Sequence, residues 1–326
     1  MRILVTGGAG YIGSVTAESL QAAGHGVWIL DNLSRGHRSA VPRGAPLIHG
    51  DVRDRESVGA LLRRERIDCV MHFCAASLVG ESMEDPGAYF DNNVVGMIHL
   101  LRAMVDAGTH GIIFSSSAAT YGEPERIPIA EDHPVRPNNP YGESKLMSER
   151  LLAWFQAVHG IRFVALRYFN AAGATERRGE DHTPETHLIP LALRAASRDG
   201  QTLSVFGRDY PTPDGTCIRD YIHVLDLADA HIRALERLDT LPERVLNLGN
   251  GEGYSVMDVV RAIERVTGRT VPVHDAPRRP GDPARLVASS ARARDLLGWS
   301  PSHPDLEGIV RDAWIWMQRF PNGYGD

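Results

Sequence analysis

Short apolar runs alternate with longer segments of mixed polarity along the first half of the chain. The runs ILVTG at residues 3–7 and VWILD at 27–31 each end in a residue suited to turns, and residues 11–23 between them have helical length. Strands that alternate with helices in this way are typical of βαβ units, so the pattern predicts a parallel sheet covered by helices on both faces. It also predicts strands within 45–51, 69–73, 111–116 and 162–169, and helices at 55–64, 87–107 and 141–159.

The alternation becomes less regular after residue 170. Polar stretches rich in glycine and proline interrupt it, for example at residues 171–186. Long loops on a rigid scaffold often carry ligand sites. We therefore predict a first domain over residues 1–170, rejoined by segments near 220–250, and a smaller α/β lobe over most of 171–326. Helices are expected at 187–198, 224–238, 255–266 and 304–319, and VLNLG at 245–249 is expected to return to the main sheet.

Composition limits the classes of function that remain. The chain has 326 residues, of which 43% are hydrophobic, enough for a packed core and two lobes. A net charge of −6 argues against a nucleic acid or an anionic membrane as partner. No apolar stretch is long enough to span a bilayer, and the opening MRILVTGG is typical of a buried strand rather than of a signal peptide.

Cysteine and histidine usage indicates the compartment and the metal content. Cys69, Cys74 and Cys217 show no C-x-x-C spacing, so we interpret them as reduced thiols of a cytoplasmic protein. The 14 histidines form no H-x-x-x-H motif and no Cys/His cluster. We therefore expect no structural or catalytic metal.

A glycine-rich stretch, TGGAGYIG at residues 6–13, follows the first predicted strand and opens the first predicted helix. Gly7, Gly10 and Gly13 have the spacing G-x-x-G-x-x-G, which lets the backbone turn tightly and approach a pyrophosphate at the helix N-terminus. A merely tight turn would not need three glycines in this context, so the stretch predicts a dinucleotide site.

The dinucleotide is predicted to be NAD. Asp31 ends the second predicted strand, where an acidic side chain can bind the ribose hydroxyls of the adenosine and would repel a 2′-phosphate. Arg35 and Arg38 lie nearby and would suit that phosphate instead. We favour NAD because the carboxylate is placed directly at the end of the strand.

The stretch PYGESK at 140–145 holds candidate chemistry. Tyr141 and Lys145 lie on one face of a predicted helix, where a cation favours the ionised form of a phenol with an ordinary pKa of about 10. Ser117 ends a predicted parallel strand, at the sheet edge where ligands bind. Beside a dinucleotide the three residues predict hydride transfer; without it, Y-x-x-x-K would indicate a half-buried tyrosine beside a solvated lysine.

Together, the glycine loop, Asp31, SSS at 115–117 and Y-x-x-x-K resemble the extended short-chain dehydrogenase/reductase family, and within it the UDP-glucose (UDP-galactose) 4-epimerases. The resemblance covers essentially the whole chain. It implies a Rossmann-type doubly wound parallel sheet with a smaller C-terminal substrate lobe. It also implies reversible C4 epimerisation of a UDP-hexose through a 4-keto intermediate with tightly bound NAD, in a homodimer joined by residues 87–107 and 141–159. Its specific stretches are DNLSRG, VGESM, DNNVVG, LRYFNAAGA, FGRDYPTPDGTCIRDYIHV and RRPGD.

The resemblance also implies a role for each matching residue. Tyr141 takes the proton of the sugar 4-hydroxyl, Lys145 tunes Tyr141 and binds the nicotinamide ribose, and Ser117 bridges substrate and tyrosine. Besides Lys145, the implied cofactor contacts are Gly7, Gly10, Tyr11, Ile12, Gly13, Asp31, Asn32, Leu33, Ser34, Asp51, Val52, Phe73, Asn92 and Phe169. Besides Ser117 and Tyr141, the implied substrate contacts are Asn170, His187, Leu188, Phe206, Arg219, Arg279 and Asp282.

Three positions depart from the family pattern. Ser77 stands where many members have a lysine that touches cofactor and diphosphate, and His187 replaces a commoner asparagine. Leu286 aligns with a gate position where a large tyrosine favours plain hexoses and a smaller side chain admits an N-acetyl group. Leucine is intermediate, so UDP-GlcNAc and UDP-GalNAc stay open as substrates.

Other functions of the same fold remain as alternatives. A nucleotide-sugar dehydratase would need an Asp–Glu pair after Ser117 as acid and base, but Ala118 and Ala119 stand there. An epimerase for UDP-glucuronate or a UDP-pentose is opposed only by the specific stretches quoted above. A non-catalytic NAD-binding protein is opposed by the presence of all three predicted catalytic residues.

Overall fold

A seven-stranded parallel sheet forms the centre of the computed structural model, which describes residues 1–197, 200–279 and 281–326. The strand order is β11-β6-β5-β4-β1-β2-β3, which confirms the predicted doubly wound α/β fold. The order reverses between β1 and β4, so the crevice for a ligand lies at their carboxyl ends. The strands are β1 (Arg2–Thr6), β2 (Gly26–Asp31), β3 (Leu47–His49), β4 (Cys69–His72), β5 (Gly111–Ser117), β6 (Arg162–Tyr168) and β11 (Val245–Leu248).

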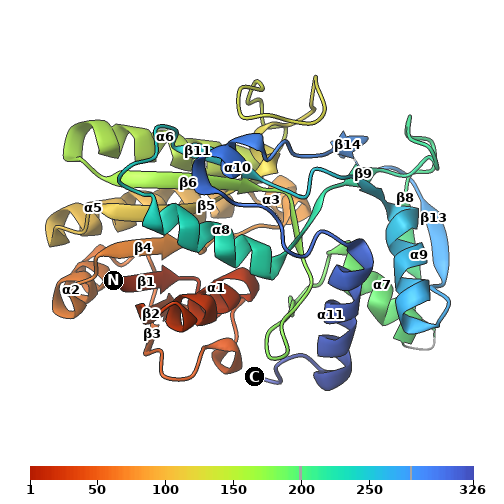
Figure 1. Cartoon of the computed structure of the whole chain (residues 1–326), viewed down its shortest axis with the longest axis horizontal. Helices are drawn as coiled ribbons and strands as arrows, with labels where there is room; N and C mark the ends of the chain where they lie inside the picture. The colour runs from red at the N-terminus through yellow and green to blue at the C-terminus, as the bar shows by residue number, and fades with distance from the viewer. Residues whose placement is uncertain (198–199, 280) are drawn as a thin grey trace.

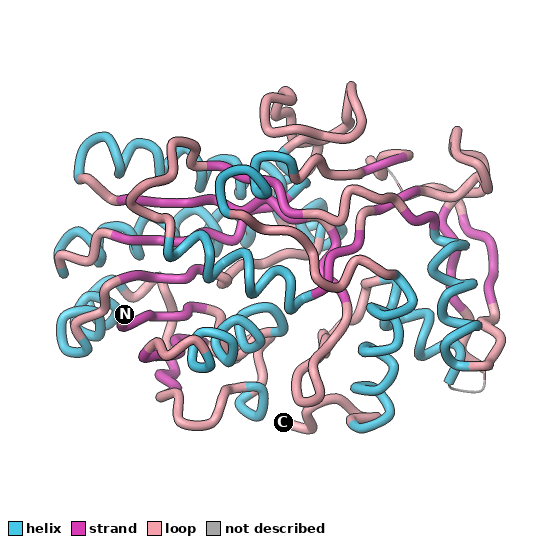
Figure 2. Tube along the Cα trace, viewed as in Figure 1, coloured by secondary structure: helices cyan, strands magenta, loops and turns pink. Residues whose placement is uncertain are grey.

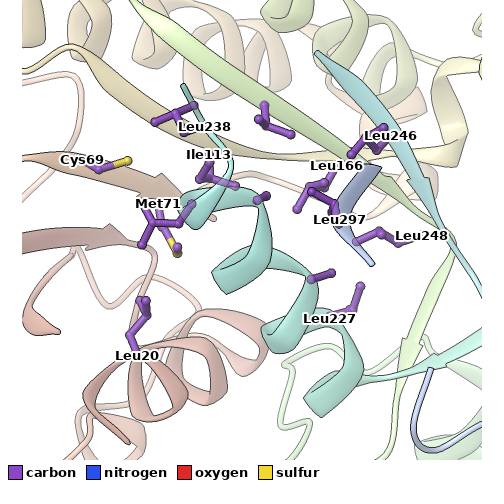
Figure 3. Close-up of a cluster of buried hydrophobic side chains, with 14 of the residues drawn as sticks. Leu20, Cys69, Met71, Ile113, Leu166, Leu227, Leu238, Leu246, Leu248 and Leu297 are labelled. Carbon is purple, nitrogen blue, oxygen red and sulfur yellow. The ribbon is translucent and has the colours of Figure 1, made fainter. Parts of the chain in front are cut away.

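Helices cover both faces of this sheet, as Figures 1 and 2 show. On one face Leu20 and Leu227, from two helices, pack with Met71 and Ile113 of the strands (Figure 3). On the other face Leu62, Leu101 and other apolar side chains form a second core with the same sheet. The first face carries α1 (Tyr11–Ala22), α8 (Val224–Glu236) and α10 (Ala291–Leu297), and the second carries α2 (Arg55–Glu65), α5 (Gly96–Ala107) and α6 (Pro140–His159).

The helix predicted at 87–107 is interrupted. It consists of α4 (Pro86–Phe90), a π-helical segment η2 (Asp91–Val95) and α5, and a further helix α3 (Val79–Glu84) precedes it. The wider turn contains the buried Asn93, which accepts from the Ala76 amide (2.9 Å) and donates to the Ala76 carbonyl and Ser144 Oγ. A π-helical turn inside a helix often marks a functional site.

The second half forms a lobe around a third apolar core. Its helices α7 (Leu188–Ser197), α9 (Val256–Thr267) and α11 (Leu306–Arg319) lie to the right in Figure 1. With α8 they confirm the predicted helices, although residue 198 of the first prediction lies outside the described residues. The short strands of this half are β7 (Asn170–Ala172), β8 (Leu203–Phe206), β9 (Ile218–Arg219), β10 (Tyr221–His223), β12 (Tyr254–Ser255), β13 (Val273–Ala276) and β14 (Arg285–Leu286).

The chain returns to the main sheet after this lobe has begun. β11 pairs in parallel with β6, which confirms the predicted return of residues 245–249. The domain boundary at residue 170 stays a prediction. Among the described residues, no helix is both long and apolar enough to cross a membrane.

Candidate active site

The glycine loop brings three backbone segments into close contact. Gly7 has a φ of 73°, and a Cβ there would lie 2.6 Å from the amide nitrogen of Cys74, which follows β4. A Cβ on Gly13 would overlap the Gly7 carbonyl. α1 begins after Gly10 with no side-chain cap, so its first N–H groups have no side-chain acceptor. A loop of this shape fits the pyrophosphate of a dinucleotide.

Asp31 lies at the end of β2, directly beside this loop. Its carboxylate is buried and accepts hydrogen bonds from the backbone of Ala9 (2.9 Å) and Leu33 (2.8 Å), one on each oxygen. Leu33 has a φ of 56°, so the chain turns sharply around the carboxylate. Each carboxylate oxygen retains a lone pair, which fits the ribose hydroxyls of NAD.

A second polar group adjoins Asp31. Asn32 donates to Asp51 (3.1 Å) and accepts from the backbone and hydroxyl of Ser34. Arg53 hydrogen-bonds the Asp51 carboxylate and lowers its pKa to about 2, although partial burial acts in the opposite direction. These predicted cofactor contacts therefore lie together after β2 and β3.

The remaining predicted cofactor residues lie along the same edge of the sheet. The Tyr11 hydroxyl donates to the Gly173 carbonyl (2.6 Å) and so ties the glycine loop to the start of the second half. Asn92, on the π-helical segment, donates to Asn93 (3.0 Å). Ile12 and Phe73 pack against the first core, Val52 is buried in the second, and Phe169 directly follows β6.

Tyr141 and Ser117 are brought together by the start of α6. Asn139 caps this helix by accepting from the Gly142 amide (2.8 Å). A Cβ on Gly142 would overlap the Ala119 carbonyl, so the helix start lies directly on the 3-10 turn η3 (Ala118–Thr120). Ser117 caps that turn and hydrogen-bonds the Tyr141 hydroxyl. The pair sits at the carboxyl end of β5, as predicted.

Lys145 is the only lysine in the chain and is buried, with 3% exposure. Its ammonium donates to the Ser115 carbonyl (2.8 Å) and lies 5.9 Å from the centre of the Tyr141 ring. Burial lowers the pKa of Lys145 to about 8, while Cys74 and Glu149 act in the opposite direction. The side chain therefore stays mainly protonated near neutral pH but loses its proton at a lower pH than an exposed lysine.

The surroundings of Tyr141 shift its pKa in the direction opposite to the one expected from the sequence. The pKa of Tyr141 is raised by burial, and the hydrogen bond with Ser117 only partly opposes this. We expected Lys145 to lower this pKa. Desolvation of the buried phenolate is the largest cause, and Lys145 is not among the groups that shift this pKa.

A buried ion pair supports these residues and was missed in the sequence. Arg167 of β6 forms two hydrogen bonds with Glu149 of α6, at 2.9 and 2.5 Å, and both side chains are 6% exposed. Ser116 donates to the same carboxylate (2.5 Å). These contacts fix α6, and with it Tyr141 and Lys145, against the sheet. In sequence, a lone Glu and a lone Arg have no feature that separates them from surface charges.

Predicted substrate residues gather in the second lobe. Arg219 of β9 forms an ion pair with Asp282, and Leu286 of β14 stands opposite Arg219 in the strand register. The guanidinium of Arg279 lies 4.0 Å from the centre of the Phe206 ring. Two arginines in one lobe can hold a diphosphate through charge-assisted hydrogen bonds.

His187 belongs to a compact group of charges. Its Nδ1 lies 2.8 Å from carboxylate oxygens of both Glu180 and Glu185. The charge of Glu180 is the main cause that raises the pKa of His187 to about 11. Burial is the main cause that raises the pKa of Tyr11, and the charges of Glu180 and Glu185 also contribute.

Three further positions complete the set. Leu188 is the first residue of α7. Asn170 is the first residue of β7, and its backbone N–H donates to the Asp220 carbonyl (3.0 Å). Ser77 is exposed in the loop between β4 and α3. Its replacement of the family's lysine therefore leaves that loop without the expected cation.

Comparison with known proteins identifies the family. The profile of the NAD dependent epimerase/dehydratase family matches residues 3–249. The chain belongs to this family. This confirms the predicted cofactor class and the resemblance inferred from the motifs, whereas the roles of individual site residues stay predictions.

Relatives match along the full length. The UDP-glucose 4-epimerase of Streptomyces lividans is 52% identical over 326 residues, which cover 100% of this chain and 98% of that protein. The crystal structure of UDP-glucose 4-epimerase from Brucella ovis in complex with NAD is 48% identical, with a TM-score of 0.93 and coverage of 96% and 97%. The Bifidobacterium longum UDP-glucose 4-epimerase in complex with NAD+ and UDP is 37% identical, with a TM-score of 0.94 and coverage of 99% and 100%.

Proposed function

We propose that this protein catalyses the reversible C4 epimerisation of UDP-glucose and UDP-galactose with tightly bound NAD. The observation that carries the proposal is the placement of Ser117, Tyr141 and Lys145 at the carboxyl end of β5, beside a loop shaped for a dinucleotide. The full-length similarity to proteins named UDP-glucose 4-epimerase supports it.

Each of the three residues has a task in this reaction. NAD, when bound, supplies a reversible hydride acceptor. Tyr141 takes the proton of the sugar 4-hydroxyl and later returns it, and Ser117 orients both hydroxyls. Lys145 is held by the Ser115 carbonyl and keeps two further N–H groups for the nicotinamide ribose. Because both the proton and the hydride would return to the sugar, the enzyme and its NAD leave each cycle unchanged.

The second lobe is proposed to hold the UDP moiety. Arg219 and Arg279 would face the diphosphate, and Leu286, beside Arg219, would contact the sugar. The N-acetylated hexoses, UDP-glucuronate and UDP-pentoses remain the alternative substrates. Ala118 and Ala119 occupy the turn where a dehydratase would need its acid and base.

We also propose a cytoplasmic homodimer. Trp154 and Val158 of α6 are 70% and 67% exposed, a large apolar area that pairing of α6 with a second copy would cover. Three free cysteines are consistent with a reducing compartment. Sedimentation as a monomer at micromolar concentration would exclude the dimer.

The first experiment is proton NMR of the purified protein with UDP-galactose and then with UDP-GalNAc, with no NAD added. Conversion of UDP-galactose would support the proposal and show that the cofactor is retained. Conversion of both would extend the substrate range to N-acetylated hexoses. If neither reacts although NAD is found in the protein, the UDP-hexose assignment is wrong.

A further inference from the structure

Four side chains in the loop between β7 and α7 converge on one point. Glu180, His182, Glu185 and His187, here called the His/Glu cluster, each offer one ligand atom, and these atoms all lie within 4.8 Å of one another. Nδ1 of His187 is 2.8 Å from an oxygen of each glutamate, and Nδ1 of His182 is 3.5 Å from Glu180. His187 is also an implied substrate contact, whereas Glu180, His182 and Glu185 have no role in the proposed reaction.

Two buried side-chain atoms in the cluster have no hydrogen-bond partner. The Glu185 side chain is 1% exposed, and its Oε1 accepts from the backbone amides of Thr186 and His187, both at 2.8 Å. Within the described part of the chain, Glu185 Oε2 and His182 Nδ1 are buried without a hydrogen bond. Burying a carboxylate oxygen without a hydrogen-bond donor costs free energy, so the site is suited to a ligand that accepts its lone pair.

We propose that the His/Glu cluster binds one divalent transition-metal ion of the zinc class. Imidazole nitrogens and carboxylate oxygens are both ligands that Zn²⁺ takes, and four is the number of ligands in its closed structural sites. The two carboxylates balance its charge. Mg²⁺ and Ca²⁺ are disfavoured because they prefer oxygen ligands throughout.

The four donors lie near the spacing of a tetrahedral site, since their ligand atoms are all within 4.8 Å of one another. Ligands at roughly 2.0–2.2 Å from a tetrahedral metal are about 3.3–3.5 Å apart. The distance from His182 to Glu180 already has this value, at 3.5 Å, and the two 2.8 Å contacts of His187 need to open slightly. Binding would replace the Nδ1 proton that His187 shares with the two glutamates.

The position of the loop indicates what the ion would do. Asp181 accepts from His37 through its carbonyl (3.0 Å) and from the Tyr324 amide through its carboxylate (2.9 Å). Arg178 donates to the Ala40 carbonyl (2.8 Å). The loop therefore lies between the NAD-binding half and the C-terminal segment. An ion with four protein ligands would fix this loop and the start of α7, and would act structurally rather than catalytically.

The test uses untagged protein prepared without chelators. We expect about one zinc per chain by mass spectrometry, and after chelation and removal of the chelator a stoichiometric zinc titration by calorimetry. Cobalt in place of zinc should give the intense visible absorption of a tetrahedral site. Replacing a ligand in His182→Ala should weaken zinc binding at least ~100-fold, since even outer partners of metal ligands are worth 10–100-fold. The control His274→Ala removes an exposed histidine of β13 and should bind zinc as the parent does.

Three results would overturn the proposal. The first is a parent protein that binds no zinc at micromolar concentration. The second is unchanged affinity in His182→Ala. The third is a cobalt spectrum of weak, octahedral type. Circular dichroism distinguishes these three results from misfolding. Glu185→Gln is a second variant, which removes the charge of the side chain while its amide oxygen can still accept the hydrogen bonds of the loop. Its affinity should also fall.

Discussion

Replacing Tyr141 with phenylalanine removes one oxygen atom and leaves the ring in place. The ring packs edge-to-face on Tyr89, with centroids 6.5 Å apart, and the Tyr141 carbonyl accepts from Ser144 (2.7 Å). The hydroxyl bonds to Ser117, whose own oxygen still accepts from the Ala119 amide. We therefore expect the free energy of unfolding to fall by about 1 kcal/mol, the value of one hydrogen bond. The melting temperature should fall by only a few degrees.

The effect on the reaction should be much larger. A positioned proton acceptor contributes roughly 10²–10⁴-fold to the rate, or about 3–5.5 kcal/mol of activation free energy. We expect kcat for UDP-galactose to fall at least ~100-fold in Tyr141→Phe. Bound NAD should remain, because the contacts of the glycine loop and Asp31 do not change. A large loss of rate with a small loss of stability separates proton transfer from a structural role.

The assay follows UDP-galactose conversion by NMR, with NAD measured in an acid extract and unfolding measured by calorimetry. Tyr89→Phe is the matched control, since it removes a neighbouring phenol oxygen that bonds to Leu78 and Glu81. This control should keep its rate within about tenfold of the parent, as expected of a residue outside the proton transfer. If Tyr141→Phe also keeps its rate with NAD bound, Tyr141 is not the proton acceptor.

Three more predictions follow from single residues. As the chain's only lysine, Lys145 should give one Cε resonance in protein grown on labelled lysine, and this resonance should titrate near pH 8. Because the pKa of Lys145 is lowered from 10.5 on folding, the free energy of unfolding should rise between about pH 8 and 10.5. A titration midpoint above about 10 would contradict the lowering of this pKa by burial. Gly13→Ala should purify without NAD because its Cβ overlaps the backbone of the loop. Gly59→Ala in α2 should retain NAD, because its Cβ meets the end of Arg63 and the Cβ of Ala103 at ordinary contact distances. Equal NAD contents in the two variants would exclude the loop as the NAD site. Asp220→Ala leaves three backbone N–H groups without their acceptor and should lower the free energy of unfolding by about 3 kcal/mol and the melting temperature by roughly 4 °C in calorimetry; an unchanged transition would contradict this.

Local pattern was sufficient for the central sheet and insufficient for the second lobe. Buried parallel strands are continuous apolar runs, so β1, β4 and β5 are visible in the sequence. The two-residue strands β9 and β14 have no such signal, since their pairing depends on segments far apart in the chain. The π-helical segment was missed for a similar reason, because its wider turn is stabilised by Asn93 contacting residues outside the helix.

The residues of the site divide in the same way: some could be paired from their spacing in the sequence, and others are brought together only by folding. Tyr141 and Lys145 could be paired from their spacing, and Ser117 from its position at a strand end. The His/Glu cluster was missed because its spacing, E-x-H-x-x-E-x-H, is not that of the metal motifs for which the sequence was inspected. Folding of the loop, rather than helical periodicity, brings its four side chains together.

Burial acts on Tyr141 and Lys145 in opposite directions, and this changes the explanation for the Y-x-x-x-K pair. It raises the pKa of the phenol above 10 and lowers that of the ammonium to about 8, so Lys145 loses its proton before Tyr141 does. A phenolate beside an ammonium therefore needs additional positive charge near the phenol. The positive nicotinamide ring of NAD⁺ is such a charge and is present only before hydride transfer. On this argument the positive ring would favour the phenolate when the proton is removed, and loss of that charge on hydride transfer would raise the pKa of Tyr141 and favour the protonated phenol.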